Sequence, residues 1–294
     1  MKDMRISRSR LTILVVSALP LAIGSLLAIF VLDTATIGDI LQINTRPVSI
    51  EELVIQTGIS VGLGTLIVFS LFYTIQRRSP SAKRTIVAFV VSPILTASFF
   101  LLSQSLLFVL FKGSSTSIFP SILSFASLGV LLMSFAFIMM DSVPPTLKNI
   151  FVAFYGSVFG TFLGVMSITA SMVVLVVVVV MEDYFLTRYS PAAQSVMLID
   201  TPGDDPFDYT RIQTRSAAVG AGDFIAFSLI AAHSFIFFPI YVWAMSIMLA
   251  LVGITINATV LARENQILPG IPLPAILSLF PWVVHVITFS LLIG

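Results

Sequence analysis

The stretch Ala217-Ala218-Val219-Gly220-Ala221-Gly222-Asp223-Phe224-Ile225 decides the fold class, because it places one carboxylate near the start of a long apolar run, residues 217–236. A charge inside such a run is costly in a membrane, so an ionisable residue there is by default a hypothesis for a functional site. The rest of the chain must show whether the run crosses a membrane and which group is the partner of Asp223.

The composition is that of a polytopic membrane protein. Of the 294 residues, 57% are hydrophobic and 10% are charged, which a water-soluble protein does not show. The formal charge is +1 and the basic residues stand in short clusters, so no nucleic-acid partner is expected. The chain has no cysteine and two histidines, and it lacks the His-Glu-x-x-His and P-loop patterns, so thiol chemistry, a common zinc hydrolase and an ATP-driven machine are not expected.

Apolar runs of about 20 residues, the length that a spanning helix needs, recur along the chain. We expect an all-α polytopic membrane protein with nine transmembrane helices in a single transmembrane domain over residues 1–294. Helices one to six occupy 11–187, a cytoplasmic loop occupies 188–216, and helices seven to nine occupy 217–293. The runs themselves are 11–32, 53–75, 86–111, 118–140, 150–181, 217–236, 240–262 and 271–293.

The run 150–181 is too long for one ordinary span, and small residues near its middle, Gly160 and Gly164 among them, offer a tight turn. Dividing it near residues 164–169 gives the ninth helix. With the N-terminus in the cytoplasm and the C-terminus outside, every Lys and Arg except Arg46 and Lys112 then lies on the cytoplasmic side. That bias is the one the positive-inside rule predicts, and a single span would lower it.

A second carboxylate reaches a similar depth from the same side. Asp183 follows a valine-rich segment near the end of the sixth expected helix, and Asp223 lies near the start of the seventh. At 1.5 Å per residue they lie roughly 8 Å and 10 Å from the cytoplasmic ends of their helices. When two carboxylates share a site, repulsion raises one pKa, so that one is protonated and the other ionised. Such a pair can activate water against a peptide bond without a metal or cofactor.

Three motifs, in chain order, carry a resemblance to a known family. Gly220-Ala221-Gly222-Asp223 resembles the Gly-x-Gly-Asp motif of presenilins and signal peptide peptidases. That family also requires an acidic partner one helix earlier, where Asp183 stands, and a Pro-Ala-Leu element at the start of the ninth helix, which Pro274-Ala275-Ile276 resembles. The motifs cover helices six to nine; for helices one to five the resemblance rests on number and orientation.

The resemblance implies a prokaryotic-type intramembrane aspartyl endopeptidase, which cleaves within transmembrane helices of membrane-protein or signal-peptide substrates. Its partners would be these substrates and the lipid bilayer, with no metal, cofactor or obligate accessory subunit; the oligomeric state, a homo-oligomer included, stays open. By resemblance, Asp183 and Asp223 are the catalytic dyad. The residues beside the substrate would be Gly220, Gly222, Pro274, Ala275 and Ile276.

Two positions depart from the family pattern. Glu182 stands where the family has tyrosine, which leaves open whether Glu182 or Asp183 faces Asp223, although motif position favours Asp183. Ile276 replaces leucine. A proton- or ion-coupled transporter also uses intramembrane carboxylates near proline-rich helix starts, but we see no inverted repeat and both aspartates lie on one side. Prepilin peptidases share Gly-x-Gly-Asp and lack the Pro-Ala-Leu element.

The remaining polar residues favour simpler expectations. Asp141 and the acidic residues of the loop 188–216 are expected to be solvated surface charges. His233, His285 and Asn257 are expected to hydrogen-bond to a neighbour rather than to relay protons. Residues 196–199 and 209–214 have strand-like composition. The second stretch is either a solvated linker or an edge that pairs with an extended substrate.

Overall fold

The computed structural model describes residues 8–32, 51, 55, 80–111, 119–189, 206–214, 218–261 and 268–293. In these ranges the chain is all-α, with eight helices and one two-stranded sheet. Five helices are long and apolar enough to cross a membrane, which indicates a multi-pass membrane protein. The expected helix at 53–75 and the strand-like stretch at 196–199 lie outside the described residues.

Each described helix falls on one of the expected apolar runs. Prolines in the first turn of several helices fit there, because no partner is needed for a backbone N–H at that position. The helices are α1 (Arg8–Leu32), α4 (Pro80–Phe111), α5 (Phe119–Met140), α6 (Pro145–Met166), α7 (Thr169–Tyr189), α9 (Ala221–Phe237), α10 (Ile240–Ile256) and α11 (Pro272–Ile293).

The predicted division of the run 150–181 is confirmed, because α6 ends at Met166 and α7 begins at Thr169. Of the small residues expected to offer the turn, Ser167 and Thr169 lie at the break, but the two glycines do not. Gly160 and Gly164 lie inside α6, where a methyl group on either would collide with the backbone of α9, at Ile225 and Leu229 respectively. These glycines therefore permit close helix packing rather than a turn.

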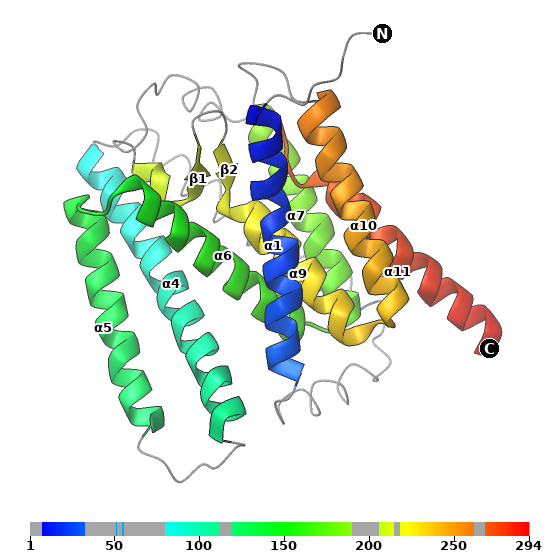
Figure 1. Cartoon of the computed structure of the whole chain (residues 1–294), viewed down its shortest axis with the longest axis horizontal. Coiled ribbons are helices and arrows are strands. Elements are labelled where there is room, and N and C mark those ends of the chain that lie inside the picture. The colour runs from blue at the N-terminus through cyan, green and yellow to red at the C-terminus, as the bar shows by residue number, and fades with distance from the viewer. Residues whose placement is uncertain are drawn as a thin grey trace.

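Helix α9 is the centre of the molecule, and its most extensive contacts are with α6 and α1. Figure 1 shows α1 in front of α6 and α9. On the α1 side a methyl group at Gly24 would lie 2.6 Å from the carbonyl oxygen of Ser228, and the Ser228 hydroxyl donates to Pro20 O at 2.9 Å. Because α9 is packed on two sides, its residues from Phe224 to Ser234 are almost all buried.

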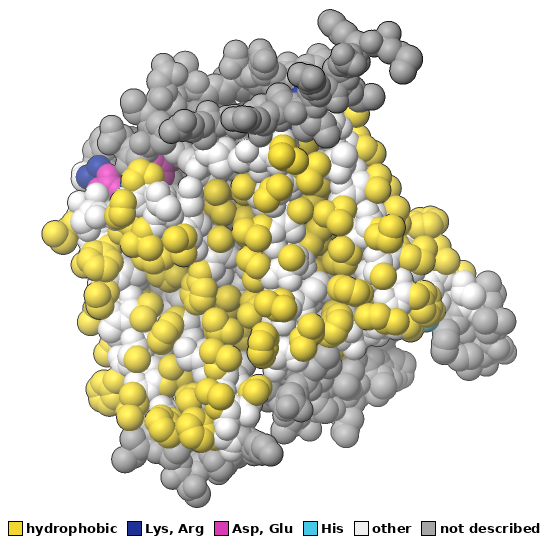
Figure 2. All heavy atoms as spheres, viewed as in Figure 1, with side chains coloured by type: hydrophobic (Ala, Val, Ile, Leu, Met, Phe, Trp, Pro, Cys, Tyr) yellow, Lys and Arg dark blue, Asp and Glu magenta, His cyan; other side chains and the backbone are white. Residues whose placement is uncertain are grey.

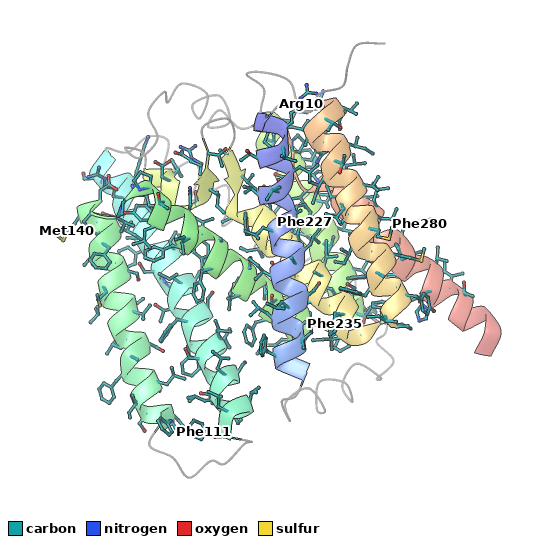
Figure 3. All side chains as sticks on the ribbon, in the orientation of Figure 1. Arg10, Phe111, Met140, Phe227, Phe235 and Phe280 are labelled. Atoms are coloured by element: carbon teal, nitrogen blue, oxygen red, sulfur yellow. The ribbon has the colours of Figure 1, made fainter. Side chains whose placement is uncertain are left out.

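Two helix pairs flank this centre, α4 with α5 and α10 with α11 (Figure 1). Phe111 at the end of α4 and Met140 at the end of α5 lie at opposite ends of their pair, so these helices are antiparallel (Figure 3). Arg10, in the first turn of α1, lies at the end of the molecule where the sheet lies (Figures 1 and 3). The start of α1 and the segment before α9 therefore share one side, as the topology predicted.

The outer surface is apolar along the length of the helices. Phe125 on α5 is 77% exposed and Leu110 on α4 is 71% exposed. On the face in Figure 2, hydrophobic side chains cover the described part of the bundle, and the visible acidic and basic side chains gather at the end where the sheet lies. That distribution is typical of a lipid-facing belt with polar groups at the membrane surface.

The sheet pairs β1 (Arg211–Gln213) with β2 (Ala218–Gly220) in antiparallel register, with Ile212 opposite Val219. Strand β1 lies inside the stretch predicted as strand-like. The expected helix start at residue 217 was wrong, because residues 218–220 are extended and α9 begins at Ala221. A local apolar pattern does not reveal this strand, since its pairing partner lies earlier in the chain.

Candidate active site

Asp223 is fixed by the start of its own helix. It is the third residue of α9, and its Oδ2 accepts a hydrogen bond from the Gly220 N–H at 3.2 Å, as the acidic residue of a capping box does. Its other oxygen, Oδ1, is buried and has no hydrogen-bond partner among the described residues. One oxygen therefore orients the carboxylate, and the other makes no hydrogen bond to the described part of the chain.

Asp183 lies near the end of α7. Its Oδ2 accepts a hydrogen bond from the Ile271 N–H at 3.0 Å, and its Oδ1 accepts one from the Thr187 hydroxyl, a turn further along α7, at 3.4 Å. The carboxylates of Asp183 and Asp223 are close enough to repel each other electrostatically. Of the two acidic residues that the sequence left open, Asp183 is the one that the structure places beside Asp223.

The backbone of Gly270 and Ile271, just before α11, lies against both carboxylates. Ile271 donates to Asp183, and a methyl group at Gly270 would lie 2.6 Å from Asp223 Oδ1. Sequence reasoning missed these two residues. The signal was the stretch Pro269-Gly270-Ile271-Pro272, in which two prolines flank the pair Gly270-Ile271, one residue before the Pro-Ala-Ile element.

The Pro-Ala-Ile element holds the Gly270–Ile271 segment in place. Pro274 packs closely on α10, because a methyl group at Gly253 would lie 2.5 Å from Pro274 Cα. Ala275 is fully buried, and its N–H donates to Ile271 O at 3.0 Å. Ile276 is 58% exposed on the outside of α11. Pro274 and Ala275 therefore hold the segment in place, while Ile276 faces outward.

The two glycines of the Gly-x-Gly-Asp motif leave space next to Asp223. Gly222 is exposed, and the nearest atom to a methyl group there would be Ile271 Cδ1 at 3.8 Å, an ordinary contact. At Gly220 the nearest atom would be Asp223 Oδ2 at 3.7 Å. Neither position has a backbone conformation that requires glycine. Neither glycine contributes a side chain to the space next to Asp223.

The outer edge of β1 is already occupied. The Asn149 side chain donates to Gln213 O and accepts from Gln213 N, both at 2.8 Å, as a neighbouring strand would. The expected substrate edge at 209–214 is therefore not open at Gln213. Strand β2 leads directly into Asp223, and its Gly220 N–H donates to Asp223 Oδ2.

Buried polar groups anchor the segment that precedes the sheet. Asp141 binds Lys148 Nζ at 2.7 Å and Arg84 Nη2 at 3.0 Å, and the Tyr209 hydroxyl donates to it at 3.5 Å. Burial and the Asp141 carboxylate raise the pKa of Tyr209 above its ordinary range. The Tyr155 hydroxyl donates to Tyr209 O at 2.8 Å. The expectation that Asp141 is a solvated charge is wrong, because its side chain is 15% exposed and joins three elements.

Asp208 was also expected to be a solvated loop charge, and it is buried instead. Its Oδ1 accepts hydrogen bonds from Arg211, at 2.9 Å from Nη2, and from the Gln213 amide. These partners are three and five residues away, so the pairing forms only because residues 206–214 fold back into the 3-10 turn Pro206–Tyr209 and β1.

His233 has the local role that was expected of it. It is fully buried, with Nδ1 2.7 Å from Gly164 O and Nε2 3.2 Å from the Thr169 hydroxyl. It thus joins α9 to both sides of the break between α6 and α7. His285 Nδ1 lies 2.8 Å from the Tyr241 hydroxyl. In the described part of the chain no group of three or more His, Asp or Glu residues could hold a metal ion.

In comparisons with known proteins, no protein-family model, no curated protein and no solved structure matches the chain.

Proposed function

We propose that the chain is an intramembrane aspartyl endopeptidase of the kind that presenilins and signal peptide peptidases represent. The observation that carries the proposal is the meeting of Asp183 from α7 and Asp223 from α9 at one backbone segment, with Asp223 Oδ1 buried and without a hydrogen-bond partner among the described residues. An intramembrane carboxylate is costly and is retained where it does chemistry.

The chemistry is that of two carboxylates sharing one proton. The ionised member removes a proton from water, the water oxygen attacks the peptide carbonyl carbon, and the protonated member donates to the carbonyl oxygen. Collapse of the tetrahedral intermediate breaks the C–N bond, and the amine leaves with a proton from the dyad. The protein's task is to hold both carboxylates in place, and the Gly220 and Ile271 N–H groups do so.

The substrate is a membrane-spanning segment whose backbone opens near the scissile bond. An extended segment needs replacement hydrogen-bond partners, which an exposed strand edge supplies. Because Asn149 occupies Gln213 on β1, we place the substrate on the edge of β2. From there the chain leads to Asp223 through Gly220 and Gly222, neither of which has a side chain. The proposed location of the protein is a prokaryotic cell membrane.

The test is cleavage of a transmembrane reporter peptide by the purified chain in liposomes. We expect cleavage by the wild type and by Glu182→Gln, the matched control on the neighbouring position, and none by Asp183→Asn or Asp223→Asn, which keep side-chain size and remove the charge. Activity of the chain alone would also support the absence of an obligate accessory subunit. Solute uptake that depends on either aspartate, without cleavage, would favour the transporter instead and overturn the proposal.

A further inference from the structure

The segment that touches both carboxylates is itself held by a side chain at the end of α10, that of its C-cap residue Asn257. Asn257 Nδ2 donates to Gly270 O at 2.9 Å, and Asn257 is buried. A buried amide is retained where its hydrogen bonds are made. Gly270 O belongs to the same peptide group as the Ile271 N–H, which donates to Asp183. Gly270 is also the residue that lies against Asp223 Oδ1.

Helix α10 contacts the segment Gly270–Pro274 at two positions that lie one helical turn apart. Gly253 and Asn257 are four residues apart and lie on the same face of the helix. Pro274 packs against Gly253, and Asn257 donates a hydrogen bond to Gly270 O. The chain from Gly270 to Pro274 is therefore fixed at both ends by one rigid element, with the Ile271 N–H between them.

The helix changes its winding where Asn257 stands. Residues Asn257–Leu261 form a π-helical turn, and the Asn257 N–H is shared between Gly253 O and Ile254 O. Such turns are rare and occur frequently at functional sites, because they redirect a side chain from the regular helical position. Here the redirected side chain is the one that reaches Gly270.

We propose that Asn257 is a positioning residue of the active site, which holds the Gly270 carbonyl and thereby places the Ile271 N–H on Asp183 and the Gly270 backbone against Asp223. The inference rests on the proposed protease function. It assigns a part in catalysis to the C-terminal end of α10, which none of the three motifs includes. Loss of the Asn257 side chain would leave both aspartates in the chain and displace the backbone that orients them.

The test uses three substitutions of Asn257 and one control. Asn257→Ala removes the amide, Asn257→Asp keeps its shape and, when ionised, cannot donate to Gly270 O, and Asn257→Gln keeps a donor on a longer stem. The control is Ser246→Ala, which removes a buried hydroxyl on the same helix that has no hydrogen-bond partner among the described residues. The readouts are kcat, KM and the pH profile of reporter cleavage, together with Tm.

We expect Asn257→Ala and Asn257→Asp to lower kcat about 10- to 100-fold with little change in KM and with a displaced pH profile, since small misplacements of catalytic groups cost this much. Asn257→Gln should recover part of kcat, and Ser246→Ala should match the wild type. A wild-type kcat and pH profile in Asn257→Ala or Asn257→Asp would overturn the inference. So would a loss that follows Tm alone with the pH profile unchanged.

An infrared titration of the carboxyl groups separates this inference from the proposed function. The bands are assigned by their loss in Asp183→Asn and Asp223→Asn, and the curve is compared between the wild type and Asn257→Ala. A displaced curve supports positioning of the carboxylates by Asn257, and coincident curves overturn it, whether or not the protein cleaves the reporter. Absence of cleavage by the wild type would overturn the proposed function alone.

Discussion

Two glycines border Asp223 for different reasons. At Gly222 a methyl group would meet only Ile271 Cδ1, at a normal contact distance, whereas at Gly270 it would lie 2.6 Å from Asp223 Oδ1. The protein itself thus requires glycine at 270. At 222 the described residues place no such requirement, and glycine is needed there only for the proposed approach of a substrate to Asp223.

Substituting each glycine separates these two requirements. We expect Gly222→Ala to fold with a Tm close to the wild type and to lower reporter cleavage by about tenfold or more, because the added methyl group occupies the substrate's path. Gly270→Ala should lower both Tm and cleavage, because it displaces the Asp223 carboxylate. Thermal unfolding and cleavage rates are measured on both variants. Full activity in Gly222→Ala would show that no substrate backbone passes there.

Tyr209 predicts an alkaline limit to stability. Burial and the Asp141 carboxylate raise its pKa above the ordinary value of about 10. The folded protein therefore keeps a proton that the unfolded chain loses, so the stabilising contribution is complete below about pH 10 and falls as pH rises above that value. We expect Tm to fall more steeply above about pH 10 in the wild type than in Tyr209→Phe. Parallel curves would contradict this role of Tyr209.

At the scale of elements, the contact between α6 and α9 sets the place of Asp223. A methyl group at Gly160 would strike the carbonyl group of Ile225, two residues beyond Asp223. We expect Gly160→Ala to lower the free energy of unfolding by about 1–3 kcal/mol, because the helices must move apart. Gly129 on α5 serves as the control, because no neighbouring atom of the described residues lies within 4 Å of a methyl group added there.

Gly129→Ala should leave stability unchanged or raise it by up to about 1 kcal/mol, since alanine favours a helix interior more than glycine. Unfolding in a detergent series measures both variants under the same conditions. Equal stabilities for Gly160→Ala and Gly129→Ala would mean that close approach of α6 and α9 does not hold this part of the molecule.

The sequence predicted the elements whose signal is local. Long apolar runs located the eight described helices and the break after Met166, and the Gly-x-Gly-Asp stretch located the start of α9 to within four residues. Strand β2 was missed because three small apolar residues read as helix until their pairing with β1 is known. The burial of Asp208 and the part-buried ion pairs of Asp141 were missed because both depend on tertiary packing, and Arg84 lies 57 residues before Asp141.

The candidate site shows the same limit. Apolar context and spacing were enough to select Asp183 and Asp223, but not the Gly270 and Ile271 backbone that lies between them. A backbone N–H carries no sequence signal of its own. Asn257 is visible in the sequence as an amide near a helix end. Its role could not be predicted, because that role depends on its acceptor, Gly270 O, which only the structure identifies.

At the scale of the whole molecule, three elements distant in sequence converge at the sheet end of the bundle. Helix α7 supplies Asp183, α9 supplies Asp223, and the segment before α11 lies against both. The cluster around Asp141 fixes the chain that enters β1 at this same end. The arrangement brings both carboxylates to one backbone segment, just after the strand that leads into α9.

The most direct test of the dyad is a double-mutant comparison of kcat/KM for reporter cleavage. Residues that act as one catalytic unit are strongly non-additive, so each single loss should cost nearly as much as the double loss. We therefore predict that Asp183→Asn, Asp223→Asn and the double variant, all with wild-type Tm, have equally low rates. Substantial cleavage by either single variant, or losses that add up in the double variant, would contradict a shared water-activating pair.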